Sequence, residues 1–270
     1  MSHVIPKSIP VVILAGGLGT RLGESSDRTP KPLVRIGNHP ILLHIISGYL
    51  KYGYTSFIIC AGYKAGEFKR YFSELDLEMN DQFFSFKNAI RTGRDLLPGT
   101  NDLRINSSEF EVAVIDTGLE TTTAGRIAKI RSLVSSDYFL CTYGDGVSSL
   151  NINELVKYHL SGNALATLTA FHPPSRFGEI DIDDDGYVSS FREKQLTASY
   201  VNGGFFVFDR SIFDLIDPDL SLEEGLLSKL SAESKLRAYL SEDYWQMMDT
   251  PREVELLNKQ IQQGSAPWLT

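Results

Sequence analysis

Residues 11–22 read VVILAGGLGTRL and decide the fold. The first five are apolar and predict a buried strand, which stops abruptly in the glycine-rich turn at residues 16–19. Glycines at this place leave backbone N–H groups open to a ligand, and a row of such amides forms a cradle for phosphate oxygens. Arg21 and Lys31, the second of them flanked by prolines, add two cations that suit a polyphosphate. The alternative is a plain surface turn after a strand, but the two cations favour phosphate binding.

The composition is typical of a globular protein with a single core. Of the 270 residues, 42% are hydrophobic and 22% are charged, so no metal or disulfide is needed to hold the fold. The net charge of -8 argues against nucleic acid or a membrane surface as a partner. No run approaches the roughly 18 apolar residues of a membrane helix, and the first residues lack a signal-peptide core. Cys60 and Cys141 lie within apolar runs, which predicts two buried free thiols and a cytoplasmic protein.

Apolar runs and helical patterns alternate through the first half of the chain. Strands are expected at 11–15, 56–61, 110–116 and 138–143, and helices at 40–52, 65–72 and about 152–160. This rhythm predicts an α/β fold with a Rossmann-like, mostly parallel central sheet that is flanked by helices. Ligands of such sheets bind at the carboxyl ends of the strands, which is where the glycine turn falls.

The second half is richer in strands and predicts a smaller β-rich part. Strands are expected at 164–171, 179–182, 187–191 and 201–208, and helices at 211–216, 222–231 and 251–263. The sequence Asp183-Asp184-Asp185-Gly186 predicts a hairpin turn rather than a calcium site, because nothing nearby completes a calcium loop. Residues 74–108 are polar and irregular, and we interpret them as a peripheral excursion or a subunit contact.

Two aspartates are candidate ligands of a metal ion. Asp145 stands between two glycines directly after a predicted strand, and Asp249 comes shortly before the last predicted helix. Mg²⁺ takes one or two protein carboxylates and draws its other ligands from phosphate and water. Each aspartate also has a local alternative, since Asp145 could cap a helix or shape a turn, and Asp249 or Thr250 could be an N-cap. A polyphosphate bound between the two would favour the metal role.

Further polar groups follow other predicted strands. Glu193 and Lys194 end one strand, where they could bind hydroxyls and phosphate or form an ordinary exposed ion pair. Asn202 and the following glycines open the next strand, where a ligand could approach closely or a bulge could form. Thr117 and Arg126 bracket the turn after a third strand and are candidate nucleotide contacts.

Other chemistries find little support in the sequence. The histidines show no metal-binding spacing, and no Ser-His-Asp or Cys-His arrangement stands out. The glycine turn does not match the G-x-G-x-x-G pattern, and no acidic residue ends a second strand about 20 residues further on. This argues against a dinucleotide-dependent oxidoreductase.

Taken in order, the motifs resemble the sugar-1-phosphate nucleotidyltransferase family over residues 10–268. The family pattern is a GGxGTRL loop, Pro-Lys-Pro, an Asp after a strand, Glu-Lys, Asn-Gly-Gly and a late Asp, and this chain contains each of these. The runs Tyr-Gly-Asp-Gly at 143–146 and Trp-Gln at 245–246 resemble the cytidylyltransferase branch in particular. Departures from the family pattern at residues 28–30, at residues 86–108 and at Gln195 bear on sugar specificity and subunit contacts rather than on the chemistry.

The resemblance implies that a cytidylyl group is transferred from CTP to a sugar 1-phosphate, in particular glucose 1-phosphate, with Mg²⁺ as cofactor. It further implies a homo-oligomer of single-domain chains, with a nucleotide-binding half over about 10–150 and a sugar-binding and C-terminal part over about 151–270. The alternatives are the same chemistry with dTTP, UTP, ATP or GTP or with another sugar 1-phosphate, and a non-catalytic paralogue that binds nucleotide sugars.

The resemblance also implies a role for individual residues. The catalytic residues would be Arg21, Lys31, Asp145 and Asp249, of which the two aspartates would hold the metal. The nucleotide would contact Leu14, Ala15, Gly16, Gly17, Gly19, Thr20, Arg21, Lys31, Thr117, Arg126, Tyr143, Gly144 and Asp145. The sugar phosphate would contact Gly178, Glu193, Lys194, Asn202, Gly203 and Trp245.

Overall fold

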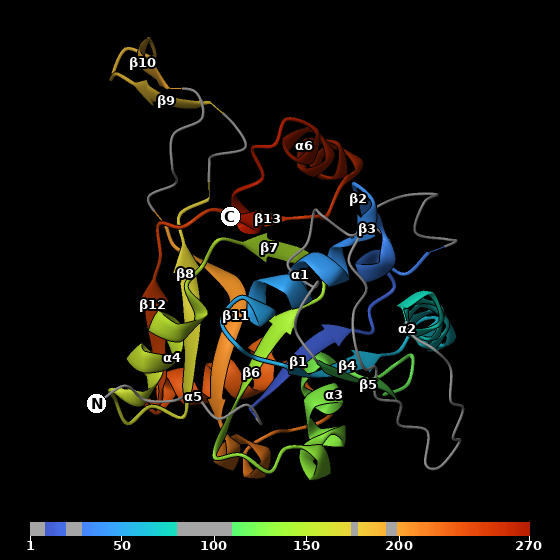
Figure 1. Ribbon diagram of the computed structural model, residues 1–270. Coiled ribbons are helices and arrows are strands. Elements are labelled where there is room, and N and C mark those ends of the chain that lie inside the picture. The colour runs from blue at the N-terminus through green and yellow to red at the C-terminus, as the bar shows by residue number, and fades with distance from the viewer. Residues whose placement is uncertain (1–8, 20–28, 80–109, 174–177, 193–198) are drawn as a thin grey trace.

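A seven-stranded sheet forms the centre of the molecule (Figure 1). The structure is a computed structural model that describes residues 9–19, 29–79, 110–173, 178–192 and 199–270. The strand order is β12-β8-β11-β6-β1-β4-β5. These strands are β1 (Pro10–Ala15), β4 (Ser56–Ala61), β5 (Glu111–Asp116), β6 (Tyr138–Tyr143), β8 (Ala166–Phe171), β11 (Val201–Asp209) and β12 (Leu236–Leu240). Within this sheet only β11 runs against its neighbours, so the expected mostly parallel sheet is confirmed.

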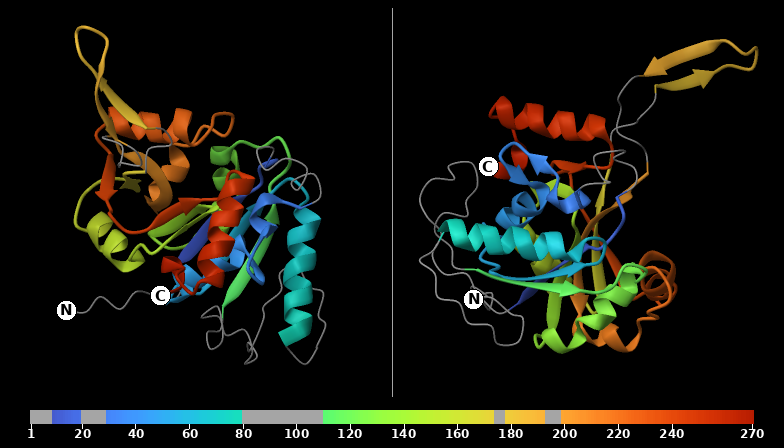
Figure 2. Two further views of the ribbon diagram at one scale, coloured as in Figure 1. Left: turned by 90° about the horizontal axis from the view of Figure 1, so that it is seen from above. Right: turned by 90° about the vertical axis from the view of Figure 1, so that its right-hand side faces the viewer.

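Helices cover both faces of the sheet (Figure 2). The face covered by α1 (Ile41–Leu50), α2 (Ala65–Met79), α4 (Ile152–Leu160) and α6 (Pro251–Gln262) forms one hydrophobic core. The opposite face packs against α3 (Thr123–Lys129) and α5 (Ser228–Ala232) and forms a second core. Successive side chains of β1 alternate between the two, because Val11 and Ile13 face the first core and Val12 and Leu14 face the second. Burial on both sides explains why this strand is apolar throughout.

Three short strand pairs complete the described structure. They are β2 (Arg35–Ile36) with β3 (His39–Pro40), β7 (Gly146–Ser148) with β13 (Trp245–Met247), and β9 (Glu179–Ile182) with β10 (Val188–Arg192). The β9–β10 pair is the predicted hairpin, closed by a hydrogen bond of 2.9 Å from the Asp183 N–H to the Tyr187 carbonyl. It projects away from the rest of the molecule in all views (Figures 1 and 2).

Several elements differ from the expectation. The helix expected at 211–216 is a 3₁₀ helix at Arg210–Asp214, and the one expected at 222–231 begins as a π-helical turn, Glu223–Leu227, before α5. Residues 74–79, which were expected to be irregular, belong to α2, which continues to Met79; residues 80–108 lie outside the described residues. Edge strand β12 was missed, because its half-exposed residues give only a weak pattern.

Two smaller expectations concern the thiols and the membrane. Cys60 and Cys141 are both free and buried, as predicted. Burial raises the pKa of Cys60 to about 12, so this thiol stays protonated and unreactive at neutral pH. Among the described residues, no helix is both long enough and apolar enough to cross a membrane.

Candidate active site

The glycine turn meets the loop after β6 at the carboxyl edge of the sheet. Strand β1 lies next to β6, with Leu14 paired with Tyr143, so the two loops leave the sheet side by side. The Gly144 N–H donates to the Leu14 carbonyl at 3.0 Å. A Cβ on Gly144 would come within 2.9 Å of the Pro32 ring, so the close approach of these three segments requires glycine there. Leu14 and Ala15 are buried beneath this junction.

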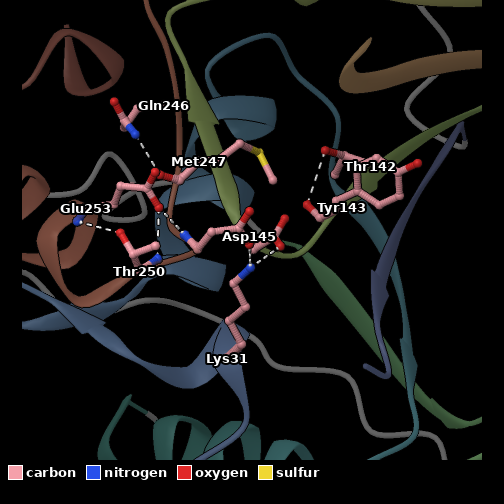
Figure 3. A network of polar contacts seen from close by, with 9 residues as sticks. Lys31, Thr142, Tyr143, Asp145, Gln246, Met247, Thr250 and Glu253 are labelled. Atoms are coloured by element: carbon pink, nitrogen blue, oxygen red, sulfur yellow. Dashed lines mark hydrogen bonds and ion pairs between the residues drawn. The ribbon is translucent and has the colours of Figure 1, made fainter. Parts of the chain in front are cut away.

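Lys31 lies between the two predicted metal-binding aspartates (Figure 3). Its Nζ donates to Asp145 Oδ2 at 2.5 Å and also donates to Asp249 Oδ1. The three side chains are largely buried, with exposed fractions of 11% for Lys31, 21% for Asp145 and 20% for Asp249. The structure therefore brings together three of the predicted catalytic residues, which are separated by as many as 218 positions in the sequence.

The pKa values of this cluster follow from burial and from the mutual charges. Burial by itself would lower the pKa of Lys31, but the two carboxylates together outweigh burial and raise it above its usual value. Burial raises the pKa of Asp145, and the Lys31 ammonium offsets only part of that increase. Lys31 therefore remains a cation over the whole physiological range, in a place where it can contact a phosphate.

The two carboxylates fit a divalent cation. Asp145 Oδ1 is buried and has no hydrogen-bond partner, so one oxygen of this pair is available to a ligand. Among the described residues, no group of three or more His, Cys, Asp or Glu side chains could form a metal cage. Two carboxylates with one orphaned oxygen are the donor set expected for Mg²⁺, which keeps its remaining positions for phosphate and water.

Asp249 is held in place from the start of helix α6. The Glu253 carboxylate accepts from the N–H groups of Asp249 at 2.6 Å and Thr250 at 2.8 Å (Figure 3). Thr250 is the N-cap and accepts from the Glu253 N–H, which completes a capping box. The capping role that the sequence left open between Asp249 and Thr250 thus belongs to Thr250. Asp145 does not cap α4 either, since the N-cap there is Asn151.

The pairing of β7 with β13 brings the two aspartate loops together. Gly146 pairs with Met247, and the Met248 N–H donates to the Asp145 carbonyl at 2.8 Å. Asp145 and Asp249 therefore depend on one short antiparallel contact for their relative position.

Arg126 is buried and ties three loops together. Its guanidinium donates to the carbonyls of Ala61, Gly118, Gly16 and Leu119 at 2.8–3.2 Å. It also donates to Thr117 Oγ1 at 2.5 Å, while that hydroxyl donates to the Ala61 carbonyl. Thr117 and Arg126, two of the predicted nucleotide contacts, thus lie at the glycine loop, and a Cβ on Gly16 would overlap the guanidinium. Arg126 thus holds the three loops together through hydrogen bonds from its guanidinium to their backbone carbonyls.

The sugar-side candidates fall at the start of β11 and beside it. Trp245 Nε1 donates to the Gly203 carbonyl at 2.9 Å, and the indole stacks on Phe171 with ring centroids 5.5 Å apart. Asn202 Oδ1 accepts from the Gly204 N–H at 2.9 Å, and the register shifts here, so the bulge considered as an alternative is present. Gly178 lies apart from these residues, against Phe191 of the projecting hairpin.

Four of the predicted site residues cannot be located, because they lie outside the described residues. These are Thr20, Arg21, Glu193 and Lys194. Gly17 and Gly19 are described, and Gly19 has a φ of 67°, a left-handed conformation that glycine adopts without strain.

Two carboxylates at the site were missed from the sequence. Glu253 could have been found, because Thr-x-x-Glu before a helix is the signature of a capping box. Glu223 accepts a hydrogen bond from the Tyr143 hydroxyl across 80 positions of sequence. No local pattern signals such a contact, since it depends on how α5 and the π-helical turn pack on the sheet.

Comparisons with known proteins show the family to which the chain belongs. The family model "Nucleotidyl transferase" matches residues 10–251. A glucose-1-phosphate cytidylyltransferase of Salmonella typhi is 41% identical over 265 residues, which is 96% of this chain and 98% of that protein. A probable glucose-1-phosphate cytidylyltransferase of Bacillus subtilis is 35% identical over 95% of this chain and 98% of that protein.

A crystal structure of HddC from Yersinia pseudotuberculosis has a similar fold. It superposes with a TM-score of 0.63 and 22% identity, covering 94% of this chain and 99% of that one. The chain belongs to the nucleotidyl transferase family, which confirms the family expected from the motifs. The relatives most like it among those named are glucose-1-phosphate cytidylyltransferases, which confirms the resemblance to that branch.

Proposed function

We propose that this protein transfers a cytidylyl group from CTP to glucose 1-phosphate, giving CDP-glucose and pyrophosphate. The 41% identity to the Salmonella typhi enzyme, over almost the full length of both chains, supports this choice of substrates. The observation that carries the proposal is the Lys31 ammonium between Asp145 and Asp249 at the carboxyl edge of the sheet. The Lys31 ammonium can contact a phosphate, and the two carboxylates can hold a divalent cation that neutralises phosphate charge, so together they suit a reaction between two phosphate anions.

The reaction is a displacement at phosphorus. A phosphate oxygen of the sugar 1-phosphate attacks the α-phosphorus of CTP, the bond from that phosphorus to the bridging oxygen breaks, and pyrophosphate leaves. The attacking monoester is already an anion near neutral pH, so no strong general base is required. The protein must hold two anions in line and stabilise the charge of the transition state.

Different residues of the site bind the triphosphate, stabilise the charge and bind the sugar phosphate. The loop amides of Gly16, Gly17 and Gly19, with Thr20 and Arg21, hold the triphosphate, and Lys31 stabilises the α-phosphate and the leaving group. Asp145 and Asp249 hold Mg²⁺, which when bound neutralises phosphate charge. Thr117, Arg126, Tyr143 and Gly144 lie on the nucleotide side, and Leu14 and Ala15 form the floor. Gly178, Glu193, Lys194, Asn202, Gly203 and Trp245 hold the sugar phosphate. Assembly into a homo-oligomer stays a prediction.

Pyrophosphate release tests the proposal. The full chain is incubated with glucose 1-phosphate, Mg²⁺ and, in turn, CTP, dTTP, UTP, ATP or GTP. We expect the highest kcat/KM with CTP and a loss of turnover in Lys31→Ala. The matched control is Lys69→Ala, an exposed lysine on α2 that is not among the predicted site residues. Higher kcat/KM with another nucleotide would overturn the choice of CTP, and no pyrophosphate from any nucleotide would overturn the activity.

A further inference from the structure

Tyr143 stands where the nucleotide side and the sugar side of the proposed site meet. It ends β6 and pairs with Leu14, the residue two before the glycine turn. On its other side β6 pairs with β11, the strand that carries Asn202 and Gly203 at its start. The direction of the Tyr143 side chain therefore affects both halves of the site.

The aromatic ring of Tyr143 is fixed by its neighbours in the sheet. It packs edge-on against Phe206, with ring centroids 5.7 Å apart and planes at 88°. Gly204 has a φ of 79°, and a Cβ there would overlap the ring. The bulge at the start of β11 thus makes the space that the tyrosine ring fills.

The phenol group is fixed separately, by Glu223. The Tyr143 hydroxyl donates to Glu223 Oε1, and Thr123 Oγ1 is 3.5 Å from the other carboxylate oxygen. The Thr123 hydroxyl also accepts from the Leu222 N–H at 2.7 Å, which ties this turn to the start of α3. Burial and the Glu223 carboxylate both raise the pKa of Tyr143, so the phenol remains a hydrogen-bond donor.

Glu223 begins the π-helical turn, a geometry that occurs frequently at functional sites. The Leu227 N–H donates to the Leu222 carbonyl at 2.9 Å, a five-residue step in place of the usual four. Leu226 of this turn and Leu222 directly before it are buried in the second core, while Glu223 is exposed. The buried leucines hold the π-helical turn against the sheet, and the Glu223 carboxylate lies beside Tyr143.

Open space lies beside this contact. Glu223 and Asn202 line a depression of about 530 Å³, whose wall also includes Leu168 and Ser228. Glu223 thus shares an open depression with Asn202, which is one of the predicted sugar-side residues.

We propose that Glu223 is a positioning residue of the substrate site, which orients the Tyr143 phenol through their hydrogen bond and thereby sets nucleotide affinity. The inference rests on the proposed function, because it takes Tyr143 to contact the nucleotide. Glu223 touches no reacting atom, so its removal weakens binding of the nucleotide and leaves the chemical step largely intact.

The test compares five variants of the full chain: Glu223→Ala, Glu223→Gln, Tyr143→Phe, the double variant Tyr143→Phe with Glu223→Ala, and the control Glu224→Ala. Glu224 is the adjacent exposed carboxylate, and its side chain accepts only a local hydrogen bond from Ser221 at 3.1 Å in the described structure. The Kd of CTP is measured by calorimetry, kcat and KM by pyrophosphate release, and Tm by circular dichroism.

For Glu223→Ala we expect the Kd and KM of CTP to rise roughly tenfold with kcat nearly unchanged, since a hydrogen bond to a charged group is lost. Glu223→Gln should restore part of the affinity, because an amide oxygen still accepts from the phenol. The double variant should bind CTP no more weakly than Tyr143→Phe, because the two residues act through one bond.

Three results would overturn the inference: unchanged CTP affinity in Glu223→Ala, equal loss in the Glu224→Ala control, or additive losses in the double variant. A lowered Tm with normal affinity in Glu223→Gln would assign Glu223 a purely structural role and overturn it as well. Failure of the proposed function looks different, because the wild-type chain itself would then release no pyrophosphate.

Discussion

Replacement of Lys31 by methionine removes the cation between two carboxylates while keeping most of the side-chain volume. In the metal-free protein, Asp145 and Asp249 would then face each other without a countercharge. Removing one partner of a buried ion pair costs about 3–5 kcal/mol. Water still reaches these carboxylates, which are 21% and 20% exposed, so we expect about 2–3 kcal/mol. For a chain of this size that lowers Tm by roughly 5–10 °C.

Divalent cations should reverse this loss. In Lys31→Met the same two carboxylates are open to Mg²⁺, which would supply the missing positive charge. A ligand at a hundred times its Kd stabilises the folded state by about 2.7 kcal/mol, which is close to the expected loss. The wild-type protein should gain less, because there Lys31 already neutralises the site.

The assay is thermal unfolding followed by circular dichroism, in EDTA and in a series of Mg²⁺ concentrations. Lys69→Met, at an exposed position on α2, is the matched control and should leave Tm unchanged under both conditions. Turnover by Lys31→Met should fall by about 10²–10³, the usual effect of removing one stabilising group from a transition state. Equal Tm values for variant and wild type in EDTA, with no response to Mg²⁺, would refute the electrostatic reasoning.

Three further predictions concern residues other than Lys31, Asp145 and Asp249. Arg126→Lys leaves carbonyls such as that of Gly16 without a hydrogen-bond donor. Urea denaturation should therefore show a free energy of unfolding that is lower by about 2–4 kcal/mol. An unchanged free energy of unfolding would contradict the role of Arg126 in holding the loops together. Burial lowers the pKa of His159 in the folded protein. As the pH falls below about 6.5, the unfolded chain binds a proton at this histidine before the folded chain does. The free energy of unfolding therefore decreases as the pH falls, until the pH passes the folded-state pKa. His159→Gln should make the free energy of unfolding fall less between about pH 7 and pH 5, and an equal fall would count against it. Thr250→Ala removes the N-cap of α6 and should cost about 1 kcal/mol in the same denaturation assay, whereas Thr250→Ser should cost less.

Much of the fold was predictable because its signal is local. Val11 to Ala15 is apolar at every position, and only a strand covered on both faces needs that pattern. The elements that were missed or mistyped lack such a signal. In the segment Glu223–Leu227, the leucine spacing fits an α-helix, and the π-helical turn arises from how those leucines pack in the second core.

The candidate site was predictable in part for a different reason. Lys31 and Asp145 could be singled out because prolines flank the first and glycines flank the second, as expected where a chain turns. Asp249 could be singled out because it comes two residues before the proline that starts the last helix. Their direct contact could not be predicted, since it depends on the pairing of β7 with β13. Arg126 was expected as a cation near the nucleotide, yet only the structure shows that its donors go to backbone carbonyls.

The sequence alone determined the class of fold and the family, and it predicted phosphate binding at the glycine turn. These depend on hydrophobic periodicity and on backbone freedom, which neighbouring residues encode together. The tertiary structure decided which charges meet and which side chains orient them. Lys31 and Asp249 are 218 positions apart, and Tyr143 and Glu223 are 80 apart. Contacts at such separations arise from packing between elements, and no local pattern records them.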